Sequence, residues 1–333
     1  MKLLFLRQFS ESDTKYLLES LSDDYQIVIP EDYSDENLTQ LIQKADVCLG
    51  NKFPDGALGF MKKLKLLQVP GAGINQLNLG PFREQKVAIG NSHSNAEYVA
   101  EYAISLLFTV LKKTHHHDRF MRDGIWFRPK ENESDLPFLS DTILNKKLGF
   151  LGFGNIGQRI AQMLSGFKLE SLVYSKSNRL FFDDDYFQNK VSFVDIATVL
   201  ESSDILFITL PLTPETRNLL SSENIFNLKK NAYLINVSRA EIIDKSSLYK
   251  ILFEGGILGA GLDVWYDDAY EENSKKYPSR EYPFHKLNNV VLSAYRAGYM
   301  MRSSPHLKGA IENLLSFSLN GKLKYEVNLE KGY

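Results

Sequence analysis

The sequence predicts an α/β protein built from two doubly wound parallel sheets. Short apolar runs alternate with helical patterns along the chain, and this alternation occurs twice in succession. Strands that alternate with helices are typical of parallel sheets whose faces are covered by helices. At 333 residues the chain also exceeds the size at which one hydrophobic core usually keeps growing, which favours two domains.

The first predicted sheet lies in the N-terminal part of the chain. Its strands are the apolar runs at residues 3–6, 26–29, 47–49, 64–69 and 87–89. The opening run is too short for the apolar region of a signal peptide, and no small-residue cleavage site follows it. We therefore expect it to form the first strand.

The second predicted sheet repeats the same rhythm further along the chain. Its strands are the apolar runs at residues 147–151, 172–174, 205–210, 233–237, 261–264 and 290–292. Between the two series, apolar residues recur at helical spacing over residues 95–112. This stripe predicts a long connecting helix with one buried face.

Two segments flank the second series. The polar stretch 123–142, with Pro129 and Pro137, predicts a loop. The tail after Gly298 has a helical pattern through about residue 319 and can return to the first domain.

Charge and cysteine content exclude several classes of partner. The 39 Lys and Arg residues against 41 Asp and Glu give a formal net charge of -2, so no overall positive field attracts nucleic acid. No apolar stretch approaches the roughly 20 residues that span a bilayer, so we expect no membrane partner. The single Cys48 excludes an internal disulfide and favours a reducing compartment, with the cytoplasm as the expected location.

The run His115-His116-His117 has the residue type of a metal site but not its geometry. Consecutive residues on a helix point about 100° apart, so three neighbouring histidines cannot all face one ion. We expect no metal, and interpret the run as an exposed or interface helix end, where His and Lys suit the negative end of the helix dipole.

A glycine motif follows the first strand of the second series. Gly152, Gly154 and Gly157 form G-x-G-x-x-G between an apolar strand and an amphipathic helix. Such glycines permit a tight turn, close approach of a pyrophosphate and packing of helix on strand. The main-chain donors of Asn155 and Ile156 then face the phosphates. The motif predicts a Rossmann domain that holds a nicotinamide cofactor; the alternative is an ordinary glycine turn.

The strand after this helix bears on the choice of cofactor. It ends at Ser175, eighteen residues past Gly157, and is followed by Lys176 and Arg179 rather than by an acid. An acid at this position binds the ribose hydroxyls of NAD, whereas a hydroxyl and two cations accommodate a 2′-phosphate. The sequence therefore favours NADP over NAD. Two alternatives stay open: the cations solvate a loop, and one of the acids at 183–185 reaches back.

Several further runs occur in the order of one family. With the glycine motif they read Pro-Gly-Ala-Gly-Ile-Asn at 70–75, Val-Ala-Glu at 99–101, Leu-Pro-Leu-Thr-Pro-Glu-Thr-Arg at 210–217, Ile-Asn-Val-Ser-Arg at 235–239 and Gly-Ala-Gly-Leu-Asp-Val at 259–264. Together they span most of the chain and are far more specific than any one alone. The chain resembles the D-isomer-specific 2-hydroxyacid dehydrogenases, and Trp265-Tyr266 resembles the formate dehydrogenase branch.

The resemblance implies how the chain is divided. A Rossmann cofactor domain, residues 98–298, is inserted into a flavodoxin-like substrate domain, residues 1–97 and 299–333, with the active site in the cleft between them. It also implies a homodimer through the region of helix 95–112. The cofactor site then includes four more residues: Pro211, Thr216, Val237 and Asp263.

The resemblance further implies how the substrate is held. Main-chain donors of Gly73 and Ile74 bind the substrate carboxylate, Asn95 contacts the substrate, and Arg239 polarises the carbonyl. A permanently charged guanidinium can bind a 2-oxo acid and can also stabilise the negative charge that develops on the alkoxide oxygen. The alternative for Arg239 is a structural ion pair.

Two catalytic positions depart from the family pattern. Asp268 stands where the family carries Glu, one methylene longer; it either orients a partner or is, with Asp267, a solvated loop acid. Tyr295 stands where the family carries the histidine that exchanges a proton with the substrate oxygen. Tyrosine, with a pKa of about 10, matches this task less well than histidine at about 6.5. His93, just before the connecting helix, is an alternative proton donor.

The sequence thus predicts an NAD(P)-dependent oxidoreductase that transfers a hydride between cofactor and a small 2-hydroxy or 2-oxo acid. Turnover is expected to be slow or atypical, because positioned acid catalysis is typically worth about 10² to 10⁴ in rate. The alternative is a pseudoenzyme that binds or senses the cofactor without turnover. The retained Arg239 and Asn95 favour the enzyme.

Overall fold

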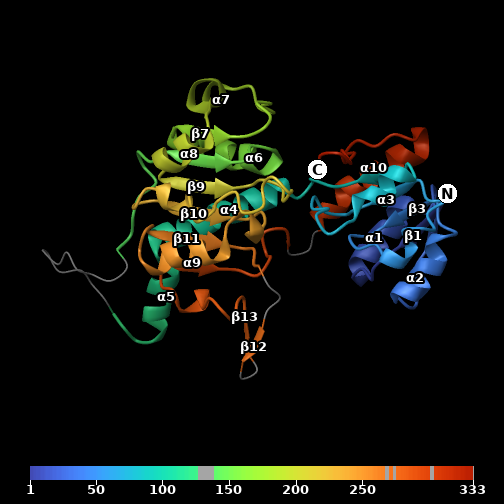
Figure 1. Cartoon of the computed structure of the whole chain (residues 1–333), viewed down its shortest axis with the longest axis horizontal. Helices are drawn as coiled ribbons and strands as arrows, with labels where there is room; N and C mark the ends of the chain where they lie inside the picture. Colours follow the sequence, from blue (N-terminus) through green and yellow to red (C-terminus); the bar gives the residue numbers. More distant parts are fainter. Residues whose placement is uncertain (127–138, 267–269, 273–274, 301–303, 333) are drawn as a thin grey trace, which may run out of the picture. The chain divides into compact units, whose positions relative to one another are not determined.

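The chain divides into two compact units, each with one parallel sheet. The computed structural model describes residues 1–126, 139–266, 270–272, 275–300 and 304–332. One unit comprises Met1–Asn95 with Gly298–Tyr333 and the other Ala96–Ala297 (Figure 1). The predicted fold class, α/β with two doubly wound parallel sheets, is confirmed.

The first unit has five parallel strands in the order β2-β1-β3-β4-β5, which is the flavodoxin-like order. The strands are β1 (Lys2–Phe5), β2 (Gln26–Val28), β3 (Val47–Leu49), β4 (Leu66–Gln68) and β5 (Ala88–Gly90). The helices are α1 (Glu11–Leu21), α2 (Asp35–Ile42), α3 (Leu79–Glu84) and α10 (Pro305–Asn320), with a short 3-10 helix η1 (Asp55–Ala57).

Helix α10 places the C-terminal tail in the first unit. Its apolar residues Leu307, Ile311 and Leu314 share a buried cluster with the first sheet and α1. The fully buried Asn313 donates to Gln68 Oε1 at 3.0 Å and to the main-chain oxygens of residues 91 and 325. The tail therefore belongs to the core of this unit, as its helical pattern suggests.

The second unit has seven parallel strands in the order β14-β11-β10-β9-β6-β7-β8. They are β6 (Leu148–Leu151), β7 (Ser171–Tyr174), β8 (Val191–Phe193), β9 (Ile205–Ile208), β10 (Tyr233–Asn236), β11 (Gly259–Leu262) and β14 (Val290–Leu292). An antiparallel pair, β12 (Tyr270–Glu272) and β13 (Lys275–Tyr277), lies outside this sheet. Strand β8 and this pair are absent from the sequence prediction.

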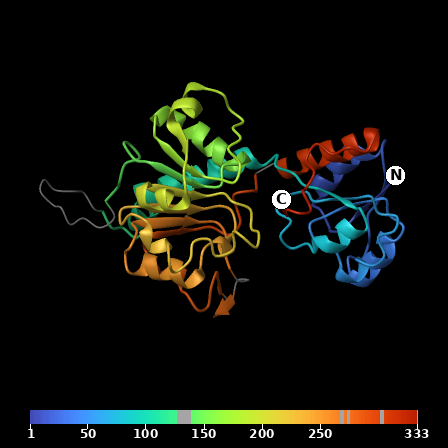
Figure 2. The ribbon, with the colours of Figure 1, turned by 45° about the horizontal axis from the view of Figure 1, so that its top comes forward.

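Helices cover both faces of the second sheet, and each face has its own apolar cluster (Figure 2). The helices are α4 (Ala96–Lys112), α5 (Thr114–Arg122), α6 (Asn155–Leu164), α7 (Asp185–Lys190), α8 (Ile196–Ser202) and α9 (Lys245–Phe253). Short 3-10 turns are η2 (Ser165–Phe167), η3 (Ile225–Asn227), η4 (Ala240–Ile242) and η5 (Phe284–Lys286).

The connecting helix α4 packs very closely on β11. A Cβ atom at Gly261 would lie 2.9 Å from Leu106 Cβ, and one at Gly259 would lie 2.8 Å from Val110 Cγ2. Glycine in β11 therefore makes room for the buried face that the sequence predicts on residues 95–112. The predicted loop 123–142 lies largely outside the described residues, including Pro129 and Pro137.

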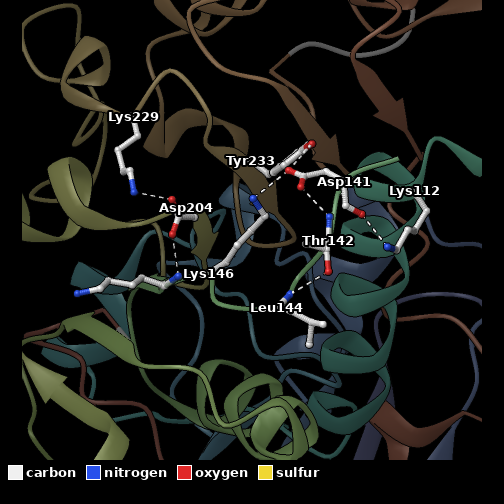
Figure 3. A network of polar contacts seen from close by, with 9 residues as sticks. Lys112, Asp141, Thr142, Leu144, Lys146, Asp204, Lys229 and Tyr233 are labelled. Atoms are coloured by element: carbon white, nitrogen blue, oxygen red, sulfur yellow. Dashed lines mark hydrogen bonds and ion pairs between the residues drawn. The ribbon is translucent and has the colours of Figure 1, made fainter. Parts of the chain in front are cut away.

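Hydrogen bonds and ion pairs between polar residues connect the segments that precede strands of the second sheet (Figure 3). Asp204, just before β9, accepts hydrogen bonds from Lys147 N at 2.8 Å and Lys229 Nζ at 2.5 Å. Asp141 pairs with Lys146 Nζ at 2.9 Å and accepts from the Tyr233 hydroxyl at 3.2 Å. Because these residues precede their strands, the network lies at the amino edge of the sheet, away from the glycine turn.

Helix α5 accounts for the histidine run. His116 is buried, and its Nε2 lies 2.6 Å from the main-chain oxygen of Asn288. The His115 ring lies 3.9 Å from that of His116, and His117 is exposed. Within the described ranges, no group of three or more His, Cys, Asp or Glu residues could hold a metal ion, and no helix is long and apolar enough to cross a membrane.

Candidate functional site

The glycine turn has the local geometry that a dinucleotide site requires. Gly152 has a φ of +90°, and a Cβ atom there would lie 2.8 Å from Leu210 N. A Cβ at Gly157 would lie 2.9 Å from the Gly152 oxygen. At Gly154, the N-cap of α6, nothing lies within 4 Å of the Cβ position. Two glycines are therefore needed for packing, whereas Gly154 leaves open space for a ligand.

The start of α6 supplies donors toward this space. Asn155 and Ile156 are the first residues of the helix, so their N–H groups have no acceptor within it. With the helix dipole, such donors bind phosphate. The turn and helix start therefore fit the pyrophosphate of a dinucleotide cofactor.

The loop after β7 carries the predicted cations. Lys176 and Arg179 are both exposed, and the Arg179 guanidinium lies 5.3 Å from the centre of the Phe181 ring. Ser175 Oγ accepts from Ser177 N at 3.3 Å, which turns the chain directly after the strand. The loop thus presents a hydroxyl and two cations at the carboxyl end of β7.

The three acids that follow this loop are bonded around α7. Asp184 caps the helix by accepting from Phe187 N at 3.2 Å. Asp183 accepts from Gln188 Nε2, and Asp185 from Asn189 Nδ2, each at 2.8 Å. The hydrogen bonds of all three carboxylates are local to the helix.

Arg239, Asp263 and Tyr295 follow three neighbouring strands of the second sheet. Strands β10, β11 and β14 are adjacent and parallel, so these residues lie at the same carboxyl edge as the glycine turn after β6. Ligands of open α/β sheets bind at this edge. The topology therefore brings together the cofactor motif and three predicted site residues.

Arg239 sits on a constrained turn after β10. Asn236 Nδ2 donates to the main-chain oxygen of Arg239 at 3.0 Å, and Arg239 Nη1 donates to that of Ser238 at 2.9 Å. Burial lowers the pKa of the guanidinium, while Glu241 and Tyr295 oppose this shift. Arg239 is therefore a partly buried cation within electrostatic reach of Tyr295.

Asp263 organises the loop that carries Tyr295. Its buried carboxylate accepts from Ser293 Oγ at 2.5 Å, Arg296 N at 2.7 Å and Ala297 N at 2.9 Å. Its main-chain oxygen accepts from Tyr295 N at 2.8 Å. One residue therefore fixes both sides of the turn at 293–297.

Tyr295 has a left-handed backbone, with a φ of +53°, and about half of its side chain is exposed. Its hydroxyl donates to the main-chain oxygen of Trp265 at 2.8 Å and accepts from the N–H of the same residue at 3.1 Å. Trp265 Nε1 donates to Ser293 O at 2.7 Å. The predicted partner Asp268, with Asp267, lies outside the described residues.

The loop at 210–217 lies beside the glycine turn. Thr216 Oγ1 donates to Pro211 O at 2.7 Å and accepts from Thr213 N at 2.8 Å. The Ser238 hydroxyl, next to the buried Val237, donates to Leu210 O. Thr216 thus closes this loop, and the predicted residues Pro211 and Val237 lie on connected main-chain segments.

The predicted substrate residues of the first unit lie at its carboxyl edge. Gly73 and Ile74 follow β4, in a loop tied to the segment after β5 by the bond from Asn91 Nδ2 to Ala72 O at 3.1 Å. Ile74 is buried, and Asn95 ends the segment that leads into α4. Each unit therefore gathers its predicted residues at the carboxyl ends of its strands.

Two histidines, one of them the predicted alternative proton donor His93, have aromatic neighbours. The His93 ring lies 6.4 Å from that of Tyr325, edge to face, and the His285 ring stacks at 4.1 Å on Tyr277. His93 follows β5 in the first unit, whereas His285 lies in η5 of the second.

Sequence reasoning missed two residues of this region. Trp265 holds the Tyr295 hydroxyl through its main chain, which no side-chain motif reveals. Gln158 is fully buried beside the glycine turn. A polar residue on the apolar face of residues 155–164 was the available signal.

Comparisons with known proteins agree with this arrangement. Residues 104–297 match the model of the D-isomer specific 2-hydroxyacid dehydrogenase, NAD binding domain. A glyoxylate reductase from Thermococcus litoralis is 30% identical over 234 residues, which is 70% of this chain and 67% of that protein.

Solved structures share the whole fold. An acyclic imino acid reductase in complex with NADPH and D-Arg superposes with a TM-score of 0.81 at 24% identity, over 98% of this chain and 100% of that one. An NADPH-dependent glyoxylate/hydroxypyruvate reductase from Sinorhizobium meliloti gives 0.79 at 20% identity, over 99% and 97%. The chain belongs to the D-isomer specific 2-hydroxyacid dehydrogenases.

Proposed function

We propose that this protein is an NADP-preferring reductase that converts a small 2-oxo acid, of the size of glyoxylate or hydroxypyruvate, into the 2-hydroxy acid. Family membership supports the reaction type, and the glyoxylate reductases among the relatives support a small substrate. Ser175, Lys176 and Arg179 after β7 support the 2′-phosphate.

The observation that carries this proposal is the placement of Arg239 and Tyr295. They follow neighbouring parallel strands, at the edge where the glycine turn of β6 also lies. A cation for an oxyanion and a hydroxyl for proton transfer are the groups that carbonyl reduction needs beside a hydride donor.

Each residue then has one task. A bound nicotinamide supplies the hydride that reduces the 2-oxo carbon. The guanidinium of Arg239 binds the substrate and stabilises negative charge on the former oxo oxygen. The hydroxyl of Tyr295 breaks its hydrogen bond to the main-chain oxygen of Trp265 and gives that proton to the former oxo oxygen, while the N–H of Trp265 continues to donate to the phenolic oxygen. Main-chain donors at Gly73 and Ile74 hold the carboxylate.

Several further assignments complete the proposal. Asn95 contacts the substrate, and Asp268 is a further catalytic residue. Residues 98–298 form the cofactor domain, and residues 1–97 with 299–333 the substrate domain. Asp263, Pro211, Thr216 and Val237 belong to the cofactor site.

The assembly and location are also proposals. Two copies associate through the region of α4, which is supported by the exposed apolar Met121 in the following helix α5 and by the exposed Ile125 and Trp126 just after that helix. A reducing compartment, the cytoplasm, fits the buried thiol of Cys48, whose pKa is raised by burial.

The test is an oxidation assay with NADPH and NADH over glyoxylate, hydroxypyruvate, pyruvate and longer 2-oxo acids. We expect turnover with NADPH on the smallest acids, lost in Arg239→Ala and in Tyr295→Phe. Turnover only in Tyr295→His would show that the natural chain lacks a proton donor. Tight cofactor binding with no turnover on any acid would instead support a cofactor-binding pseudoenzyme.

A further inference from the structure

Gln158 is a fully buried polar residue on α6, one position past the last glycine of the motif. Its Nε2 donates to Phe153 O at 2.8 Å and to Arg179 O at 2.9 Å. Its Oε1 accepts from Phe181 N at 2.6 Å. Both amide hydrogens and the amide oxygen therefore have main-chain partners.

Only glutamine in one orientation satisfies these partners. Two carbonyls need donors and one N–H needs an acceptor, so a rotated amide would place like groups against each other. An apolar side chain of the same length would leave three main-chain groups without this partner. The bond to Phe153 O is buried, and the loss of its donor would leave a buried acceptor unsatisfied, which costs more than a typical hydrogen bond contributes net.

The three partners belong to the two segments that surround the proposed cofactor site. Phe153 lies inside the glycine turn, whereas Arg179 and Phe181 lie in the loop after β7. The serine bonds within that loop are 3.3 Å long, from Ser177 N to Ser175 Oγ and from Arg179 N to Ser177 Oγ. The shorter bonds to Gln158 are therefore the stronger constraint on the loop.

Gln158 also fixes the pair formed by Arg179 and Phe181. The guanidinium lies over the Phe181 ring, and Gln158 holds the main chain of both residues. Movement of the loop at 175–181 would shift the Arg179 guanidinium relative to the glycine turn.

We propose that Gln158 is a positioning residue that ties loop 175–181 to the glycine turn and so sets the selection between cofactors with and without a 2′-phosphate. This rests on the proposed function for the assignment of the cofactor site and for the preference for NADP. Gln158 does not touch the phosphate; it acts through Lys176 and Arg179, whose distance from the turn it determines.

The first test needs no cofactor. Trypsin cleavage after Lys176 and Arg179 should be at least about tenfold faster in Gln158→Met than in the natural chain, with far-ultraviolet circular dichroism confirming that the variant is folded. Gln162→Met, the same change at an exposed position of the same helix, should cleave at the natural rate. Equal cleavage of all three proteins would overturn the proposal.

If Gln158→Met does not fold, a second measurement on the natural chain tests the proposal. In the natural chain, hydrogen exchange of the Phe181 amide should be slowed at least about tenfold relative to the amide of Leu180. An unprotected Phe181 amide would contradict the bond to Gln158, and with it the proposal.

The third test measures dissociation constants for NADPH and NADH by calorimetry. We expect Gln158→Met to move the ratio of the two constants toward one by about tenfold, and Gln162→Met to keep the natural ratio. An equal loss of affinity for both cofactors would reduce Gln158 to a purely structural role and overturn the selectivity claim. In the natural chain, a ratio of the NADPH and NADH dissociation constants near one would contradict both the selectivity claim and the NADP preference. If Gln158→Met shifts this ratio but the natural chain shows no turnover, only the proposed reaction is contradicted.

Discussion

The hydroxyl of Tyr295 is bonded twice to the main chain of Trp265, as donor to its oxygen at 2.8 Å and as acceptor from its N–H at 3.1 Å. The side chain is nonetheless about half exposed. The hydroxyl is therefore held in one place at the carboxyl edge of the sheet, with its proton directed at the Trp265 oxygen.

Replacement of this hydroxyl should lower turnover. For Tyr295→Phe we expect kcat to fall by about 10² to 10⁴, because that is the usual worth of positioned proton transfer. KM should change little, since the proton moves only in the transition state. Steady-state assays with NADPH and glyoxylate check this, with the exposed Tyr299→Phe as a matched control. An unchanged kcat in Tyr295→Phe would assign the proton to another group, and His93→Ala would then be the next variant to assay.

Arg239→Ala should lower kcat/KM by about 10² to 10³, the usual effect of removing one oxyanion donor. The affinity for NADPH should stay near its natural value, because the guanidinium acts on the substrate. The exposed Arg217→Ala is the control. A loss of cofactor affinity of similar size would instead indicate a structural ion pair.

Two glycines of the motif should respond differently to alanine. Gly154→Ala should leave the melting temperature nearly unchanged, because its Cβ position is open, and should weaken NADPH binding by about tenfold or more. Gly152→Ala should destabilise the fold, since its φ is +90° and the added Cβ would meet Leu210 N. Thermal unfolding and calorimetry on both variants distinguish the two roles; equal melting temperatures would refute the difference.

Asp263→Asn should cost about 1 to 3 kcal/mol in the free energy of unfolding, because the new amide would face donors at Ser293, Arg296 or Ala297. Turnover should fall as well, since the same bonds fix the turn that carries Tyr295. Urea unfolding and steady-state assays check the two effects, with the exposed Asp55→Asn as the control. A variant of natural stability would contradict the role of this carboxylate in the turn.

Acid should destabilise the region of α5. Burial, aided by neighbouring positive groups, lowers the pKa of His115 to about 4, below the value of about 6.5 expected in the unfolded chain. The unfolded state therefore binds the proton more readily, and the stabilisation present above pH 6.5 is lost as the pH falls toward 4. Urea midpoints measured from pH 7 to 4 should fall more steeply in the natural chain than in His115→Gln. Parallel curves would exclude this histidine as a cause.

The sequence predicted most of the sheet architecture, because buried parallel strands are short apolar runs. Strand β8 was missed because Ser192 interrupts the short apolar run of Val191–Phe193. The pair β12 and β13 was missed because its charged residues resemble a solvated loop. An apolar run is therefore a poor signal for short strands that polar or charged residues interrupt.

Some features of the candidate site could likewise be predicted from the sequence, and others could not. The glycine motif could be recognised because its spacing is local and its backbone demands are specific. The role of Asp263 in the turn at 293–297, and that of Gln158 between two segments, depend on contacts between residues 21 to 34 positions apart. Such contacts arise only when the sheet aligns the ends of its strands.

The left-handed backbone at Tyr295 bears on how this site changes in evolution. A φ of +53° is uncommon for a bulky side chain, and histidine adopts that region more readily. An exchange of tyrosine for histidine therefore requires no change in the main chain. The codons of the two residues differ by a single base. A single base change can thus exchange the two side chains, with the turn around them already built.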